Sequence, residues 1–276
     1  MTVIAAVITS YFTVHATDSF ITTPKSDGAL VIEEAEETKI IPVPAWRGAI
    51  SYWGLATHKP DWRTLNWLRT RTSKAGTYSS AKDFAEAIAS ELTTALRART
   101  FRSIRESGIG MHFTAYEKVN GYWIPELFQI RNWEDERYST VRNEIRVTRE
   151  TFGATQGTSD RSGEDGTPER RLHVHTFLRE GGMLIFNNGD PRIFNPIANS
   201  ALSTLLDLRQ RGELRDPTDV KTHLALTRRP VEIVSKLLSD FAKNDVRRVG
   251  GKPHDLAIAP SGEMTSTTGD DHIPST

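Results

Sequence analysis

The chain opens on two short apolar runs that together predict a pair of β-strands. Residues 1–9 and 11–19 are rich in Val, Ile, Ala and Thr, and the polar break between them falls at Ser10. β-Branched residues favour strands, and a short polar break between two such runs favours a tight hairpin. Because chain termini usually fray, a core strand at the start of a chain is unusual. The pattern therefore makes an N-terminal hairpin the centre of the predicted fold.

The rest of the pattern predicts further strands and four helices. Strand-like runs occur at residues 29–32, 39–43, 48–56, 108–116, 123–130, 138–147, 173–178, 182–188 and 256–259. Helical spacing of apolar residues occurs at residues 58–71, 80–96, 195–208 and 227–245. Asn120-Gly121 predicts a hairpin turn, and Gly250-Gly251 predicts the C-terminal cap of the last helix. We expect the strands within 39–56 to join the sheet of the first hairpin, in a fold of the α+β class.

Composition argues against several kinds of partner and excludes several kinds of site. The 276 residues include 35 Lys and Arg against 35 Asp and Glu, so the zero net charge does not favour a nucleic-acid or anionic-membrane partner. The absence of Cys excludes disulfides, a Cys nucleophile and Cys-based metal sites. The first basic residue is Lys25, which argues against a signal peptide, and no apolar run is long enough to cross a membrane. We expect a soluble, cytoplasmic protein with one large domain or two small ones.

Thr2 is the first candidate for chemistry. If Met1 is removed, the mature chain begins with a residue that carries both a hydroxyl and a free α-amine. The hydroxyl can act as nucleophile, and the amine can act as its general base because an α-amine titrates near pH 8. A Met-Thr start is common and does not by itself indicate a catalytic Thr. The case for Thr2 as a nucleophile therefore depends on the residues that accompany it.

Four further candidate residues follow Thr2 in the sequence: Asp18, Thr22, Lys39 and Gly54. Asp18 ends an Ala-Thr-Asp run at 18 − 2 = 16 residues after Thr2, and Thr22 follows four residues later. Lys39 begins a short apolar run, and Gly54 lies 54 − 39 = 15 residues beyond it, near the end of another. In these features the sequence resembles the proteasome β-subunit and HslV group of N-terminal-nucleophile hydrolases.

The resemblance implies a role for each of these residues. Thr2 would supply the nucleophilic hydroxyl and the amine. Lys39 would lower the pKa values of both groups by like-charge proximity, and Asp18 would hold Lys39 in place. The Gly54 N–H would stabilise the tetrahedral oxyanion, and Thr22 would contact the substrate.

The resemblance also implies a fold, an activity and an assembly. The fold would be a four-layer αββα sandwich in a single domain over residues 1–262, with insertions near 23–37 and 131–171 and a disordered tail at 263–276. The protein would cleave peptide or other amide bonds through an acyl-Thr2 ester, without a cofactor. It would form a homo-oligomer, either a ring or a smaller assembly, with an ATPase as partner.

Some positions depart from the family. Asn188 and Asp190 stand where the family has a Ser that helps the Thr amine, and Arg248 stands where it has a Ser after the candidate Asp245. These departures leave two alternatives open: a non-catalytic subunit that keeps only the fold, in which Asp18 is a plain turn residue, and an amidase acting on a small metabolite.

One pair of histidines, His173 and His175, is a candidate metal site. His173 and His175 alternate along a predicted strand and would point to the same face. No third ligand lies near them in the sequence, so we expect no metal there.

Overall fold

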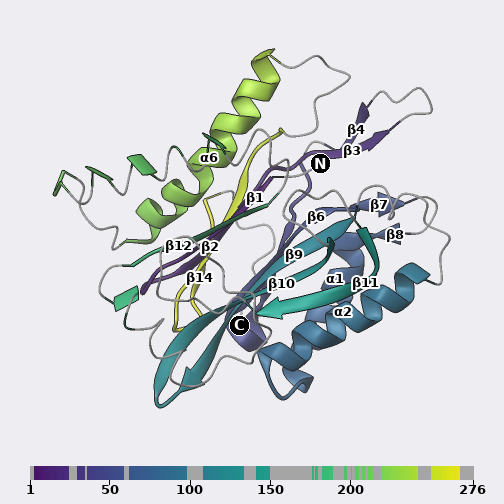
Figure 1. Cartoon of the computed structure of the whole chain (residues 1–276), viewed down its shortest axis with the longest axis horizontal. Coiled ribbons are helices and arrows are strands. Elements are labelled where there is room, and N and C mark those ends of the chain that lie inside the picture. Colours follow the sequence, from purple (N-terminus) through teal and green to yellow (C-terminus); the bar gives the residue numbers. More distant parts are fainter. Residues whose placement is uncertain are drawn as a thin grey trace.

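The computed structural model describes residues 3–24, 30–34, 36–58, 62–97, 108–133, 141–149, 182–188, 219–241 and 250–267, with isolated positions between 176 and 213. Most of the described strands belong to two five-stranded antiparallel sheets (Figure 1). The first sheet has the order β12 (Leu184–Asn188), β1 (Ile4–Ile8), β2 (Thr13–Thr17), β13 (His254–Ile258) and β14 (Met264–Thr265). The second has the order β11 (Val141–Arg149), β10 (Tyr122–Trp133), β9 (Ile109–Val119), β6 (Gly48–Gly54) and β5 (Ile40–Val43).

Smaller elements complete the described part of the chain. Two short hairpins lie beside the sheets: β3 (Ile21–Pro24) with β4 (Leu30–Glu34), and β7 (Thr57–His58) with β8 (Trp62–Arg63). The helices are α1 (Thr64–Thr72), α2 (Ala81–Arg97) and α6 (Val220–Phe241), with 3-10 turns at Pro44–Trp46 and Ala75–Thr77. None of the helices in these residues combines the length and the apolar character that crossing a bilayer requires.

The predicted N-terminal hairpin is confirmed. β1 pairs with β2 on one side and with β12 on the other, so it is an interior strand of the first sheet. All five residues of β1 are buried, as are all five of β2. Burial on both faces explains why β1 is continuously apolar instead of alternating with polar residues.

The strands at 39–56 form the expected pair but join the other sheet. β5 pairs with β6, and β6 then pairs with β9, which places both in the second sheet. The expectation that they extend the first hairpin's sheet is therefore wrong. The pattern within a strand tells which face is buried, but it does not tell which distant strand lies alongside.

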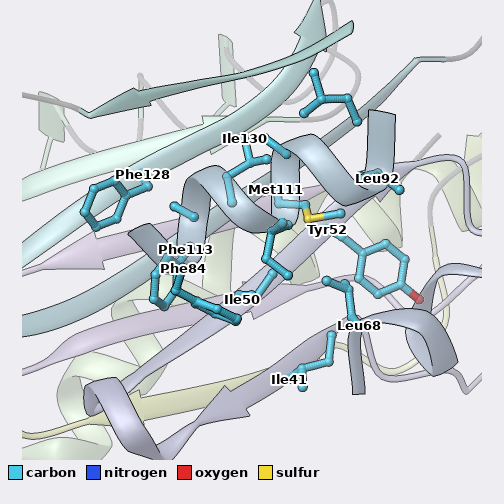
Figure 2. Close-up of a cluster of buried hydrophobic side chains, with 14 of the residues drawn as sticks. Ile41, Ile50, Tyr52, Leu68, Phe84, Leu92, Met111, Phe113, Phe128 and Ile130 are labelled. Atoms are coloured by element: carbon cyan, nitrogen blue, oxygen red, sulfur yellow. The ribbon is translucent and has the colours of Figure 1, made fainter. Parts of the chain in front are cut away.

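The largest apolar core lies between the second sheet and helices α1 and α2 (Figure 2). Ile50 and Tyr52 of β6 point to this side, together with Met111 and Phe113 of β9. From α2 it receives residues at helical spacing: Phe84, Ile88, Leu92 and Leu96. The helix predicted at 80–96 is confirmed, and the Ser80 hydroxyl accepts the Asp83 N–H at 3.0 Å as an N-terminal cap. The helix predicted at 58–71 begins only at Thr64, because Trp62 and Arg63 form β8.

The space between the two sheets contains buried polar side chains as well as apolar ones. His15 of β2 lies with Nδ1 2.9 Å from the Ser51 hydroxyl of β6 and Nε2 2.8 Å from the Thr114 hydroxyl of β9. The Asn188 amide of β12 contacts Nε2 of His112 in β9. Burial lowers the pKa of His15 to about 3 and holds the pKa of His112 well below its ordinary value, so both rings are neutral at neutral pH.

The expected four-layer αββα sandwich is contradicted. The described strands form two five-stranded antiparallel sheets, and the long helices described are α1, α2 and α6. The long helix against the first sheet is α6, which contacts β1, β2 and β13 (Figure 1), and the helical residue Ile197 packs against the same apolar cluster as Val3 and Ala5. A helix is about 10–12 Å wide and strands lie about 4.8 Å apart, so one helix covers roughly half of a five-stranded sheet. Half of the positions in the helix predicted at 195–208 are described, and each of these is helical, which supports that prediction.

Three further expectations differ from the structure. The last long helix begins at Val220, earlier than the predicted 227, and is described as far as Phe241; residues 242–249 lie outside the described part of the chain, and Gly250 accepts the Ser19 N–H just after β2. Thr176 and Leu178, predicted as strand, are helical. Residues 263–267 are not a disordered tail, because β14 pairs with β13 and the Thr267 N–H donates to the Asp255 carboxylate at 2.7 Å.

Close strand contact at Gly48 gives a first testable prediction. A Cβ at Gly48 would lie 1.9 Å from the backbone oxygen of Thr114, whereas a Cβ at Gly76 would lie 3.5 Å from the Ala45 Cβ. We expect Gly48→Ala to lower the free energy of unfolding by about 1–3 kcal/mol, since β6 and β9 must move apart. Gly76→Ala is the matched control and should leave it within about 0.5 kcal/mol. Urea denaturation of both variants measures this, and equal stability would contradict the close approach.

Candidate functional site

Asp18 and Lys39 form a buried ion pair at the end of β2. The Lys39 Nζ donates to Asp18 Oδ1 at 3.0 Å, and both side chains have a solvent exposure of 0%. Nζ also donates to the backbone oxygen of Phe20 at 2.7 Å. The resemblance to N-terminal-nucleophile hydrolases singled out both residues, and in the structure they are in direct contact.

The Asp18 carboxylate also accepts two backbone N–H groups. The Val3 N–H donates to Oδ1 at 2.9 Å, and the Gly250 N–H lies 3.4 Å from Oδ2. In return, the Asp18 N–H donates to the Val3 backbone oxygen at 3.1 Å. One carboxylate therefore connects the start of β1, the Lys39 ammonium and a segment 232 residues further along the chain.

Backbone hydrogen bonds fix the segments that carry this pair. The Ser19 N–H donates to the Gly250 oxygen at 3.1 Å, and the Glu37 N–H donates to the Ser19 oxygen at 3.2 Å. The Tyr52 N–H of β6 donates to the Lys39 oxygen at 3.2 Å. Because both sheets contribute to this framework, the position of Lys39 depends on how the two sheets are held together.

The proposed nucleophile, Thr2, lies outside the described residues. Its neighbour in the chain is Val3, whose side chain is fully buried and whose N–H is bound by Asp18. The peptide bond that joins Thr2 to Val3 therefore carries the N–H that Asp18 accepts. This is the structural link between Thr2 and the ion pair.

Opposing effects act on Lys39. Burial lowers the pKa of its ammonium group below the ordinary value, because desolvation disfavours the charged form. The negative charge of Asp18 and its hydrogen bond act in the opposite direction, followed by the charge of Glu37. The fully buried amine therefore depends on its carboxylate neighbours to stay protonated.

Gly54 is the last residue of β6 and has a backbone that favours glycine. Its φ angle is +85°, and an added Cβ would lie 2.3 Å from the Gly108 oxygen. The next residue, Leu55, donates its N–H to that same oxygen at 3.0 Å. Gly54 lies two residues beyond Tyr52, which pairs with Lys39. The role of its N–H as oxyanion donor stays a prediction.

The other predicted site residues have different outcomes. Thr22 lies in β3, paired with Ile32 of β4, and its contact with substrate stays a prediction. The Asn188 side chain is buried against His112, so the structure does not support it as a partner of the Thr2 amine. Asp190, Asp245 and the pair His173 and His175 lie outside the described residues.

The structure adds residues that sequence reasoning missed. Glu37 falls at the end of the expected insertion at 23–37, yet it is 5% exposed, and the Tyr52 hydroxyl donates to its Oε1 at 3.0 Å. Arg63 forms a salt bridge with the other oxygen of Glu37. Gly250 was taken for a helix cap, but a Cβ there would lie 2.5 Å from the Phe20 ring. The two-residue spacing of Glu37 and Lys39 was the available signal, since residues two apart in an extended chain share a face.

A comparison with protein-family models finds no matching family, and a search of curated protein sequences finds no similar protein. The functional argument therefore depends on the geometry around Asp18 and on the spacing of the sequence motifs.

Proposed function

We propose that this protein is a threonine-type hydrolase of the N-terminal-nucleophile kind, which cleaves amide bonds with Thr2 after removal of Met1. The observation that carries the proposal is the buried Asp18–Lys39 pair, whose carboxylate binds the N–H of the residue directly after Thr2. Burying two charges is costly unless they are paired and hydrogen-bonded, so such a pair beside the chain start calls for an explanation. A catalytic role explains why it lies there.

The proposed reaction follows the order of acyl transfer. The Thr2 hydroxyl attacks the substrate carbonyl carbon while its proton passes to the Thr2 α-amine, and the resulting oxyanion faces the Gly54 N–H. The C–N bond then breaks, the α-ammonium returns the proton to the leaving amine, and an ester to Thr2 remains. Water, deprotonated by the same amine, hydrolyses the ester and restores Thr2. Lys39 contributes a fixed positive charge that favours the neutral amine and the developing alkoxide.

Peptide bonds are the proposed substrates, on the strength of the resemblance to proteasome β-subunits and HslV. The same resemblance supports a homo-oligomer, an ATPase partner and a cytoplasmic location as parts of the proposal. An amidase with a small-molecule substrate would use the same residues, so substrate class is decided by assaying peptides and small amides side by side.

A non-catalytic subunit is the second candidate function. The observation that favours it is that the Asp18 contacts with Val3 and Gly250 join distant segments and stabilise the fold by themselves. Asn188, one of the candidates to assist the amine, is occupied by His112. Retained Met1 would distinguish this alternative, because it leaves Thr2 without the free amine that serves as the base.

The test is intact mass spectrometry of the protein from its native host, before and after incubation with a β-lactone that acylates N-terminal Thr. We expect loss of Met1 and one adduct that maps to Thr2. Thr2→Ala should abolish the adduct, whereas Thr2→Ser, which keeps a hydroxyl and an amine, should retain it at a reduced rate. Retained Met1 with no adduct would instead establish the non-catalytic alternative.

A further inference from the structure

Glu37 is held at the site as firmly as Asp18. Its side chain is almost fully buried, the Tyr52 hydroxyl donates to one carboxylate oxygen at 3.0 Å, and Arg63 binds the other. Its own N–H pairs with the Ser19 oxygen at 3.2 Å, directly after Asp18. Both oxygens and the backbone of Glu37 are therefore fixed, which is not expected of a surface acid in a solvated run.

The position of Glu37 places its carboxylate charge where it acts on Lys39. The two residues are two apart, and the segment is anchored on one side by Ser19 and on the other by Tyr52. Tyr52 contacts both, through its N–H to the Lys39 oxygen and its hydroxyl to Glu37. Lys39 therefore lies in the field of two buried carboxylates, the nearer from Asp18 and the second from Glu37.

The charges of this cluster balance. Asp18 and Glu37 supply two negative charges, and Lys39 and Arg63 supply two positive charges. Three of the four side chains are buried, while Arg63 is 37% exposed and reaches Glu37 from the solvent side. Arg63 pairs with Glu37 without contributing a second fully buried cation beside Lys39.

We propose that Glu37 is a positioning residue of the site, a second carboxylate that Tyr52 and Arg63 hold in place so that Lys39 remains a fixed ammonium ion. The relevance of Glu37 to catalysis rests on the proposed function, but its effect on Lys39 does not. Among the described residues, the charges of Asp18 and Glu37 act on Lys39, and the Lys39 charge in turn helps to lower the pKa of the partly buried His254.

The direct test is the titration of Lys39, followed by NMR in protein labelled with ¹³C at the lysine ε-carbon. The Lys39 signal is the one that disappears in Lys39→Arg. In Glu37→Gln we expect the pKa of Lys39 to fall, because the charge of Glu37, which acts on Lys39 in the same direction as that of Asp18, is lost. Glu36→Gln is the matched control: it removes the exposed neighbouring carboxylate and should leave the Lys39 titration unchanged.

A second comparison covers the case in which Glu37→Gln leaves Arg63 without a partner and unfolds. The variant Glu37→Gln/Arg63→Gln is compared with Arg63→Gln, so that only the carboxylate differs, and Lys39 should again titrate lower in the double variant. Glu37→Asp keeps the charge and should restore most of the wild-type titration. An unchanged Lys39 titration in both comparisons would overturn the inference.

The β-lactone reaction separates this inference from the proposed function. If the wild-type protein is labelled, the alkaline limb of the labelling rate should move to lower pH in Glu37→Gln, in step with the Lys39 titration. Labelling with an unmoved alkaline limb would refute a role for Glu37 while the hydrolase stands. If the wild-type protein is not labelled, the proposed function fails, and the NMR titration still decides whether Glu37 holds the charge of Lys39.

Discussion

Replacing Lys39 by Met is expected to lower the free energy of unfolding by about 3–5 kcal/mol, because it leaves the Asp18 carboxylate buried without its cation. Met has a similar length and no charge, so the effect reports the ion pair more than a change of volume. The Phe20 oxygen also loses its donor at 2.7 Å. Urea denaturation at pH 7 measures the loss, and a change below about 1 kcal/mol would show that Asp18 is satisfied by its backbone partners alone.

Two comparisons make this result specific. In the double variant Asp18→Asn/Lys39→Met no unpaired charge remains, so the loss should be smaller than in Lys39→Met alone. Lys236 pairs with Asp240 on α6 at 3.1 Å, but the Lys side chain is 76% exposed. Lys236→Met should therefore cost less than about 1 kcal/mol. A similar loss in the two single Lys variants would contradict the importance of burial.

Acid is expected to destabilise the protein steeply below about pH 6, because two histidines between the sheets are buried in the neutral form. In the unfolded chain each ring binds a proton near its ordinary pKa of 6.5, whereas folded His15 does so only near pH 3 and folded His112 also well below 6.5. Between these values the unfolded state binds more protons, so stability rises with pH and is lost as the pH falls. Each ring contributes about 1.4 kcal/mol per pH unit, or about 2.7 for the pair.

Variants separate the histidines from other titrating groups. The slope is the free energy of unfolding measured in urea at several values between pH 6 and pH 4. His15→Gln keeps groups that can bond the Ser51 and Thr114 hydroxyls but does not titrate, so it should reduce the slope by about 1.4 kcal/mol per pH unit. His254 is only partly buried, so His254→Gln should reduce it less. An identical slope in His15→Gln and the wild-type protein would show that His15 is protonated in the folded state.

Local pattern was sufficient to predict most individual elements. The β1–β2 hairpin, helix α2 and the turn at Asn120-Gly121 all have strong signals within a few residues, and the structure confirms them. The turn has φ angles of +50° and +87°, which Asn and Gly tolerate. Errors arose where distant pairing decides the outcome. Nothing near Gly48 shows that β6 pairs with β9 and not with β2.

The candidate site was predictable in part for the same reason. Asp18 and Lys39 were identified because they match motif positions of the N-terminal-nucleophile hydrolases that the sequence resembles. The same resemblance implies that the two residues pair. Gly250 was not identifiable, because its bond to Asp18 spans 232 residues and a glycine after a helix predicts a cap. Glu37 was hidden by its neighbours, since an acidic run is usually solvated. Only the fold shows that one of its members turns inward to Tyr52 and Arg63.

The interior position of β1 has a consequence for the order in which the molecule assembles during synthesis. β1 leaves the ribosome before the other described strands, yet one of its two neighbours in the sheet, β12, is made 188 − 4 = 184 residues later, as the pairing of Ile4 with Asn188 shows. The partner of Asp18 at Gly250 emerges later still. Contacts between such distant segments make folding slow, because the loop between them must close before they form. A nascent chain therefore carries an incomplete site until synthesis has passed Gly250, which delays any reactivity of Thr2 until the surrounding sheets are in place.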